Sequence, residues 1–232
     1  MQQFLESFQQ NFIEKERWRY LLDGLYNTLQ VTFFAVLLGI ALGFIIAIIR
    51  ASHDKNNNSV ILKILNFICN IYLTVIRGTP VIVQLMIITF VIFAGADVDK
   101  VFVAVLAFGI NSGAYVAEII RGGIMSIDNG QFEAGRSLGF NYVRTMWHII
   151  LPQTLKNVLP ALGNEFIVLL KETSVVSVIA LRDLTMGGNI IRSQTYSPFM
   201  PLLAVAFIYL VLVIIFSYLV KCLERRLRNS DR

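Results

Sequence analysis

Long apolar runs set the fold of this chain. Residues 201–220 contain no charged side chain, and about 20 apolar residues in a helix cross the ~30 Å hydrocarbon core of a bilayer. Over the whole chain 56% of residues are hydrophobic and 15% are charged, whereas soluble domains carry about 25% charged residues. The runs have helical length and lack the alternating pattern of a membrane barrel. The sequence therefore predicts an all-α membrane protein.

We predict five spans in a single transmembrane domain that covers residues 1–232. The polar start lacks the basic and short apolar parts of a cleavable signal, so the first span is a retained helix. Residues 77–80 (RGTP) interrupt the second span, where proline should kink the helix because it removes a backbone donor. No polar loop follows this kink, so we treat the segment as one span. The predicted spans are about 25–49, 68–93, 101–120, 155–170 or slightly beyond, and 201–220.

Basic residues predict the orientation of these spans. The connections on one side of the membrane contain 12 Lys and Arg, and those on the other side contain 6. Because cytoplasmic segments retain positive charge, the richer side should be cytoplasmic, with the N-terminus outside and the C-terminus inside. The net charge of +5 then reflects topology, and we expect no nucleic-acid partner. The richer connections are 50–63, 121–156 and 221–232; the poorer ones are 1–20, 95–100 and 182–198.

The longest predicted cytoplasmic connection has the residues of two short helices. Asp128 and Gln131 have the spacing of a capping box, in which a side-chain oxygen accepts a free amide at a helix start. Gly139 can adopt the left-handed conformation that ends a helix. Asn141 can cap a second helix, and Pro152 suits the first turn of the next span. Such a segment predicts a rigid surface that could transmit force.

This connection, about residues 121–152, also carries a motif. Its members are Glu133, Ala134, Gly135, Gly139, Ile149, Leu151 and Pro152. In their spacing the connection resembles the EAA loop of permease subunits of ATP-binding-cassette importers. The family usually has alanine where this chain has Gly135, and glycine should weaken the helix by roughly 1 kcal/mol. The resemblance implies that Glu133, Ala134, Gly135, Gly139 and Pro152 couple the chain to an ATPase.

Three further segments resemble the polar amino acid branch of that family. They are VIRGTPVIVQ at 75–84, NSGAYVAEIIR at 111–121 and LPALGNEFIVLLKE at 159–172, and the whole resemblance covers about residues 22–228. It implies the five-helix core of a type I importer permease in the bacterial inner membrane. The implied partners are a dimer of ATPase subunits, a second permease chain (a copy or a paralogue) and a periplasmic, extracellular or lipid-anchored binding protein.

Several kinds of chemistry are missing from the sequence. No stretch fits the phosphate-binding pattern G-x-x-x-x-G-K-[ST], so we expect ATP hydrolysis by a separate subunit and no enzyme activity here. His53 and His148 lack metal-ligand spacing, and Cys69 and Cys222 lack redox or metal spacing. We therefore expect neither a metal nor a cofactor in this chain.

Polar residues inside the spans predict a substrate path. A charge in a span costs at least ~2.5 kcal/mol, so it should face water, a substrate or a partner. At 100° per residue, Asn164, Glu165 and Glu172 of the fourth span fall within an arc of about 120°, and Asn111 and Tyr115 of the third span share a narrow face. These faces line the translocation cavity or, alternatively, join helices through internal hydrogen bonds.

Two charges near the cytoplasmic side remain, and we expect Arg77 and Glu118 to form an ion pair that offsets their burial. The carboxylate of Glu165 favours a cationic solute. We therefore favour a basic amino acid, such as arginine, lysine or histidine, with glutamine or cystine as alternatives. An ion-coupled secondary carrier or a channel would also explain charged spans, but neither needs the EAA pattern.

Overall fold

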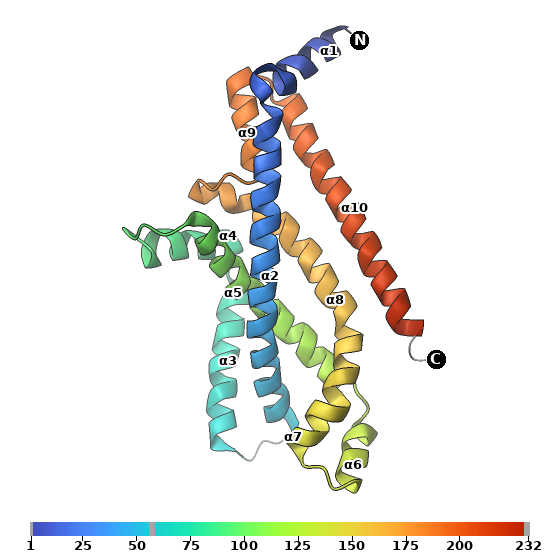
Figure 1. Cartoon of the computed structure of the whole chain (residues 1–232). Helices are drawn as coiled ribbons and strands as arrows, with labels where there is room; N and C mark the ends of the chain where they lie inside the picture. The colour runs from blue at the N-terminus through green and yellow to red at the C-terminus, as the bar shows by residue number, and fades with distance from the viewer. Residues whose placement is uncertain (1, 56–58, 230–232) are drawn as a thin grey trace.

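The computed structural model describes residues 2–55 and 59–229, and its described residues form helices without strands. Residues 56–58, which belong to a predicted cytoplasmic connection, lie outside this range. The long helix α2 (Trp18–Lys55) runs along most of the length of the molecule (Figure 1). The prediction of an all-α fold is confirmed.

The chain passes back and forth along the long axis of the molecule (Figure 1). α1 (Gln2–Phe8) and α9 (Leu184–Thr195) lie at one end of the molecule. The short helices α6 (Asn129–Ser137) and α7 (Tyr142–Thr145) lie at the other end. Short helical turns join α1 to α2 and α8 to α9. The helices that make the passes after α2 are α3 (Val60–Gly78), α5 (Lys100–Met125), α8 (Leu151–Glu172) and α10 (Phe199–Asn229).

Among the described residues, four helices are long and apolar enough to cross a membrane. They are Trp18–Asp54, Val60–Gly78, Lys100–Met125 and Phe199–Leu227. α8 contains the predicted fourth span and has the length of one, with 22 residues. Its polar side chains keep it below the hydropathy of the other four. α8 nevertheless lies between α5 and α10 and packs against both.

The predicted second span is not one kinked helix. α3 begins at Val60 and not near residue 68, and it ends at Gly78. Thr79 and Pro80 are extended, with ψ of 146° and 135°. Proline lacks an amide hydrogen and disfavours the helical conformation in the residue before it, so the two effects together break the helix completely.

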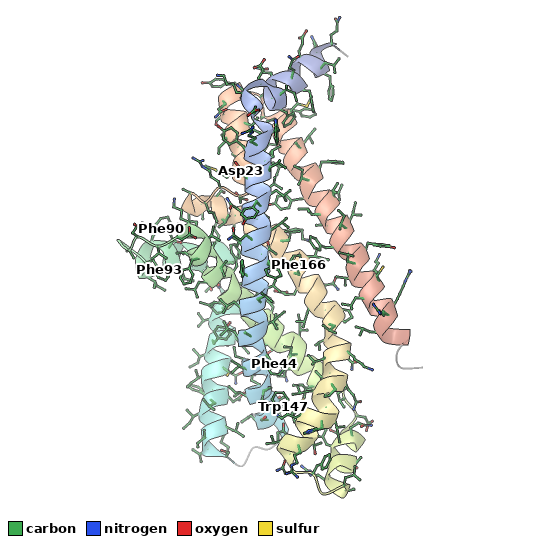
Figure 2. The ribbon with its side chains drawn as sticks, viewed as in Figure 1. Asp23, Phe44, Phe90, Phe93, Trp147 and Phe166 are labelled. Carbon is green, nitrogen blue, oxygen red and sulfur yellow. The ribbon has the colours of Figure 1, made fainter. Side chains whose placement is uncertain are left out.

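The segment after the break leaves the axis of α3. It consists of α4 (Val81–Ile87) and the π-helical turn η3 (Ile88–Ile92), which form a short apolar arm. Figure 2 shows Phe90 and Phe93 near the far end of this arm. The arm is tied to the body at its base, where Leu85 and Ile88 enter a buried cluster with Phe108 of α5.

α2 and α5 form the most extensive helix pair of the fold, because small residues let their backbones approach. A Cβ added at Gly39 would lie 2.9 Å from the Ser112 side chain, and one at Gly43 would lie 2.6 Å from Val116. Small residues four positions apart commonly permit such close packing in membranes. α5 is thereby held at the centre of the fold, with the candidate sites on either side of it.

Candidate functional site

α6 (Asn129–Ser137) starts with the predicted Asp128 cap, at the end of the molecule opposite α1 (Figure 1). The Asp128 carboxylate accepts a hydrogen bond from the Gly130 amide at 2.6 Å. Gln131 does not complete the predicted capping box, since its side-chain oxygen accepts from the Gln153 amide at 3.4 Å. Gln131 therefore links α6 to the first turn of α8.

Gly139 ends α6 as predicted. Its φ is +77°, in the left-handed region, where only glycine avoids a steric cost. Its amide donates to the carbonyl of Arg136 at 2.9 Å, and the Phe140 amide donates to the carbonyl of Gly135 at 3.0 Å. These two bonds are the Schellman motif, which satisfies the free carbonyls at a helix end.

The second short helix is not separate from the next span. α7 (Tyr142–Thr145) follows Asn141. The Asn141 side chain caps the helix by accepting a hydrogen bond from the Arg144 amide at 2.9 Å. The helix then passes through the π-helical turn η4 (Met146–Ile150) directly into α8. Pro152 lies in the first turn of α8, as predicted. α7, η4 and α8 therefore form one continuous helical segment.

Gly135 has a packing role that its helix propensity does not predict. It is buried, and a Cβ at this position would lie 2.7 Å from both the Cγ2 and the Oγ1 atom of Thr145. That distance is shorter than real Cβ contacts. Glycine therefore lets α6 lie directly against α7.

The outer side of α6, α7 and η4 is open. Glu133 and Ala134 are exposed, and the apolar side chains of Leu138, Val143 and Trp147 are 72%, 60% and 56% exposed. Figure 2 shows Trp147 at this end of the molecule. A pocket of about 200 Å³ lies beside them. Apolar side chains gathered on a polar surface are typical of protein-binding sites. After the role that the sequence predicts for this loop, we call these five residues the coupling surface.

One polar contact joins α7 to α2, and an ion pair nearby joins α2 to α5. The Tyr142 hydroxyl donates to Ser52 of α2 at 3.4 Å. Burial raises the pKa of the Tyr142 phenol, so it stays a protonated donor at neutral pH. Nearby, Arg121 of α5 lies 3.2 Å from Asp54 of α2. The ends of both helices are therefore fixed next to α7.

The predicted ion pair between Arg77 and Glu118 is wrong. Glu118 binds Arg50 of α2 through one carboxylate oxygen, and its other oxygen lies 3.3 Å from Arg121. Arg77 instead lies over the ring of Tyr115, 5.7 Å from its centroid. α2 packs along α5 more closely than α3 does, and Arg50 therefore reaches Glu118. Arg50 lies at the edge of the predicted first span, where its position in the sequence gives no sign that it reaches Glu118.

Two of the predicted path residues form hydrogen bonds between helices. Asn111 is buried and donates to the side-chain oxygen of Gln84 at 3.0 Å. Glu165 of α8 accepts from the Ser112 hydroxyl of α5 at 2.9 Å. Both contacts fit the alternative interpretation, in which polar residues join helices. Gln84 was not predicted as a member of this set, although it is a lone polar residue in an apolar segment.

Gln84 also spans the break between α3 and α4. Its amide donates to the Ile76 carbonyl at 2.7 Å, and to the carbonyl and hydroxyl oxygens of Thr79 at 3.1 and 2.8 Å. The side chain is buried. One amide therefore joins the end of α3, the start of α4 and, through Asn111, the middle of α5.

The remaining residues of the predicted path are exposed or partly exposed in the single chain. Tyr115 and Asn164 are exposed, and Glu172 is partly exposed. Asn164 shares its helix face with exposed Asn157 and Lys171, so α8 presents an uncovered polar stripe. In the described part of the chain, no group of three or more His, Cys, Asp or Glu side chains could hold a metal ion.

Comparisons with known proteins agree on one family. Residues 39–229 match the model of the binding-protein-dependent transport system inner membrane component. The arginine transport system permease ArtQ of Bacillus subtilis is 37% identical over 214 residues, which cover 91% of this chain and 94% of ArtQ. The putative glutamine transport system permease GlnP of Rickettsia typhi is 39% identical over 210 residues, which cover 90% and 93%.

A solved structure agrees with these relatives. The crystal structure of an amino acid ABC transporter with histidines has a TM-score of 0.81 and 44% sequence identity to this chain. The match covers 93% of this chain and 98% of that one. The likeness therefore extends over the whole helical core, including the EAA loop and both helices that carry the intramembrane carboxylates.

Proposed function

Because the chain belongs to the family of binding-protein-dependent transport system inner membrane components, we propose that it forms the membrane path of an importer for a basic amino acid. The chain is a multi-pass permease subunit of an amino acid ABC importer, and ATP hydrolysis is by a separate ATPase subunit. The family also implies a substrate-binding protein. An ion-coupled carrier finds no support among these relatives.

Two carboxylates on α8 support the proposal of a cationic substrate. Glu165 and Glu172 are seven residues apart, so they lie on one line of the helix. Among the described residues, neither has a basic group within ion-pair distance, and Glu165 has only the Ser112 hydroxyl as a partner. An ionised carboxylate in a span is costly unless water or a cation meets it. A cationic solute would supply that charge during transport.

The second positive charge of a basic amino acid separates it from neutral substrates. Every amino acid carries an ammonium group, but its own carboxylate balances that charge. Arginine, lysine and protonated histidine carry one further positive charge on the side chain, which the carboxylates of α8 would attract. ArtQ is named for arginine and the similar solved transporter was crystallised with histidines. GlnP is named for glutamine, which keeps glutamine, and with it cystine, as the alternatives to test.

The continuous helix from α7 to α8 supplies the coupling step. We propose that the ATPase docks on the coupling surface from the cytoplasm, with the N-terminus of the chain outside and its C-terminus inside. Movement of α7 then displaces α8, and with it Glu165. The polar stripe of α8 would face a second permease chain across the path, and that chain is a copy or a paralogue.

Uptake in a defined system tests the proposal. The permease, its ATPase and its binding protein are reconstituted in liposomes, and uptake of labelled arginine, lysine, histidine, glutamine and cystine is measured. We expect the basic amino acids to be taken up fastest. Glu165→Gln keeps the shape and removes the charge, so it should slow basic uptake more than glutamine uptake.

A matched control separates this effect from general damage. Glu224→Gln removes the same charge from an exposed position near the end of α10, and it should leave all five rates unchanged. Equal rates for wild type and Glu165→Gln with every amino acid would show that Glu165 acts only as a contact between helices. Fast uptake of glutamine or cystine alone would overturn the basic substrate.

A further inference from the structure

α3 carries a polar stripe along one face. Five polar side chains on this otherwise apolar helix recur at intervals of three or four residues, so at 100° per residue they fall within about 80° of one another. The last three are exposed in this chain. They are Asn70, Thr74 and Arg77, and the stripe begins with Lys63 and Asn66.

The stripe ends at a polar pocket between α3, α2 and α5. The pocket has a volume of about 360 Å³ and is lined by Arg50, Asn70, Leu73, Thr74, Arg77, Gly78 and Glu118. Two guanidinium groups and one carboxylate therefore face the same space. A pocket of this size holds a small solute and not a macromolecule.

The charges around the pocket do not cancel. Both oxygens of Glu118 are engaged, one by Arg50 and the other by Arg121, and Asp54 engages Arg121 from its far side. Those four charges balance. Arg77 remains, since no carboxylate among the described residues lies within ion-pair distance of it. The pocket therefore has an excess of one positive charge.

The residues that line the pocket carry hydrogen-bond donors. The Nε atom of Arg50 is buried and has no hydrogen-bond partner among the described residues. Leaving a buried donor unsatisfied costs about 1–3 kcal/mol. The Asn70 amide and the Thr74 hydroxyl line the same space. An acceptor with several lone pairs in the pocket would accept from the exposed Asn70 and Thr74 donors.

Arg77 is not needed to end its own helix. A basic residue in the last turn of a helix commonly binds the free carbonyls there. In α3 those carbonyls already have donors: Thr79 Oγ1 donates to Val75 at 2.8 Å, and the Gln84 amide donates to Ile76 at 2.7 Å. The guanidinium group only stacks on Tyr115, so its donor edge stays available.

We infer that this pocket is an oxyanion site that holds the carboxylate of the transported amino acid. It would lie on the path toward the end of the molecule where the coupling surface is. Planar guanidinium groups match a carboxylate in a two-point hydrogen bond. The inference rests on the proposed function, because it takes the amino acid as the solute. Glu165 on α8 would then attract the cationic end of the solute, and Arg77 on α3 would bind its anionic end.

Binding of a simple carboxylate tests the site without transport. The permease and ATPase complex is placed in nanodiscs of phosphatidylcholine, and trifluoroacetate binding is measured from the width of its fluorine NMR signal. We expect saturable broadening that acetate reverses. Arg77→Gln should weaken binding at least about tenfold, because it removes a charge-assisted pair. Arg192→Gln, an exposed arginine on α9, should bind like wild type.

Two results would overturn the site. Equal binding by Arg77→Gln and wild type would remove Arg77 from it, provided that both complexes elute alike in gel filtration and hydrolyse ATP at the same rate. Loss of wild-type trifluoroacetate binding when phosphatidylglycerol replaces phosphatidylcholine would assign the pocket to a lipid phosphate. Thr74→Val should weaken binding less than Arg77→Gln, since it removes one neutral donor.

The outcome is separable from that of the uptake experiment. Trifluoroacetate carries no ammonium group and needs no binding protein, so its binding reports on the pocket alone. Wild-type uptake of arginine in the liposomes reports on the proposed function alone. If uptake favours glutamine while trifluoroacetate still binds, the result supports the oxyanion site and refutes the proposed preference for basic amino acids.

Discussion

Arg50 on α2 and Glu118 on α5 form a salt bridge across the most extensive helix pair of the fold. Their side chains are 18% and 25% exposed, so solvent screens the pair only partly. The second Glu118 oxygen binds Arg121, whose other contact is Asp54. This chain of charges connects the α3 pocket to the helix ends that hold the coupling surface.

Removing the Glu118 charge should destabilise the fold. Glu118→Gln leaves two guanidinium groups without their shared carboxylate, and we expect the free energy of unfolding to fall by about 2 kcal/mol, the usual worth of hydrogen bonds to charged groups. Equilibrium unfolding in detergent micelles measures it. Glu133→Gln, at an exposed carboxylate, should change little. The loss in an Arg50→Gln and Glu118→Gln double variant should be smaller than the sum of the single losses; additive losses would show no coupling.

Gly139 should be essential for coupling. Gly139→Val places a β-branched residue at a φ of +77°, a strain of about 1–3 kcal/mol that should distort the end of α6. We expect the ratio of substrate uptake to ATP hydrolysis to fall several-fold in liposomes. Gly95→Val is the matched control, because Gly95 has a φ of +76° in a loop away from α6. An unchanged ratio in Gly139→Val would separate the helix end from coupling.

Shortening Thr145 should relieve the steric clash that a larger residue at Gly135 creates. Helix propensity alone predicts that Gly135→Ala stabilises α6 by about 1 kcal/mol. The added methyl group would meet Thr145 at 2.7 Å, so we expect destabilisation and faster proteolysis of α6. Thr145→Ala removes both atoms in the way, and the double variant should recover wild-type protease resistance. Protection of α6 in the single Gly135→Ala variant would contradict the observed contact.

Thiol labelling tests the orientation. In a background with both native cysteines replaced by serine, Ser137→Cys on α6 should resist an impermeant thiol reagent in intact cells and react after permeabilisation. Asp97→Cys, in the loop before α5, should react in both. Ser137 and Asp97 are both exposed, so accessibility of the introduced side chains does not limit labelling. The opposite labelling pattern would place the coupling surface outside and refute the charge rule for this chain.

The local features of the fold followed from the sequence because each depends on a few neighbouring residues. The Asp128 and Asn141 caps and the left-handed Gly139 are of this kind, since a side chain and the next three or four amides fix their geometry. The faces of α8 also followed from its regular twist. A kink at residues 77–80 was predicted, but not a complete break, in which the distant Gln84 side chain binds the free carbonyls of Ile76 and Thr79.

The partners of charged residues did not follow from the sequence. Choosing between Arg50 and Arg77 for Glu118 requires the depth and rotation of three helices, and a helix turns by 100° for each residue of error in its start. α3 starts at Val60, well before the predicted boundary. The roles of Asn111 and Glu165 were open for the same reason, since cavity lining and contact between helices demand the same residue types.

The Gln84 amide has a consequence for how the transporter can change shape. The break at Thr79 and Pro80 looks like a free joint, but the Gln84 side-chain amide donates back across it to the Ile76 carbonyl and to the two oxygens of Thr79. Asn111 of α5 in turn donates to the Gln84 side-chain oxygen. α3, α4 and α5 should then move as one rigid body. Sliding between access states would be confined to the boundary between this body and α8, where Ser112 and Glu165 form the contact that has to shear.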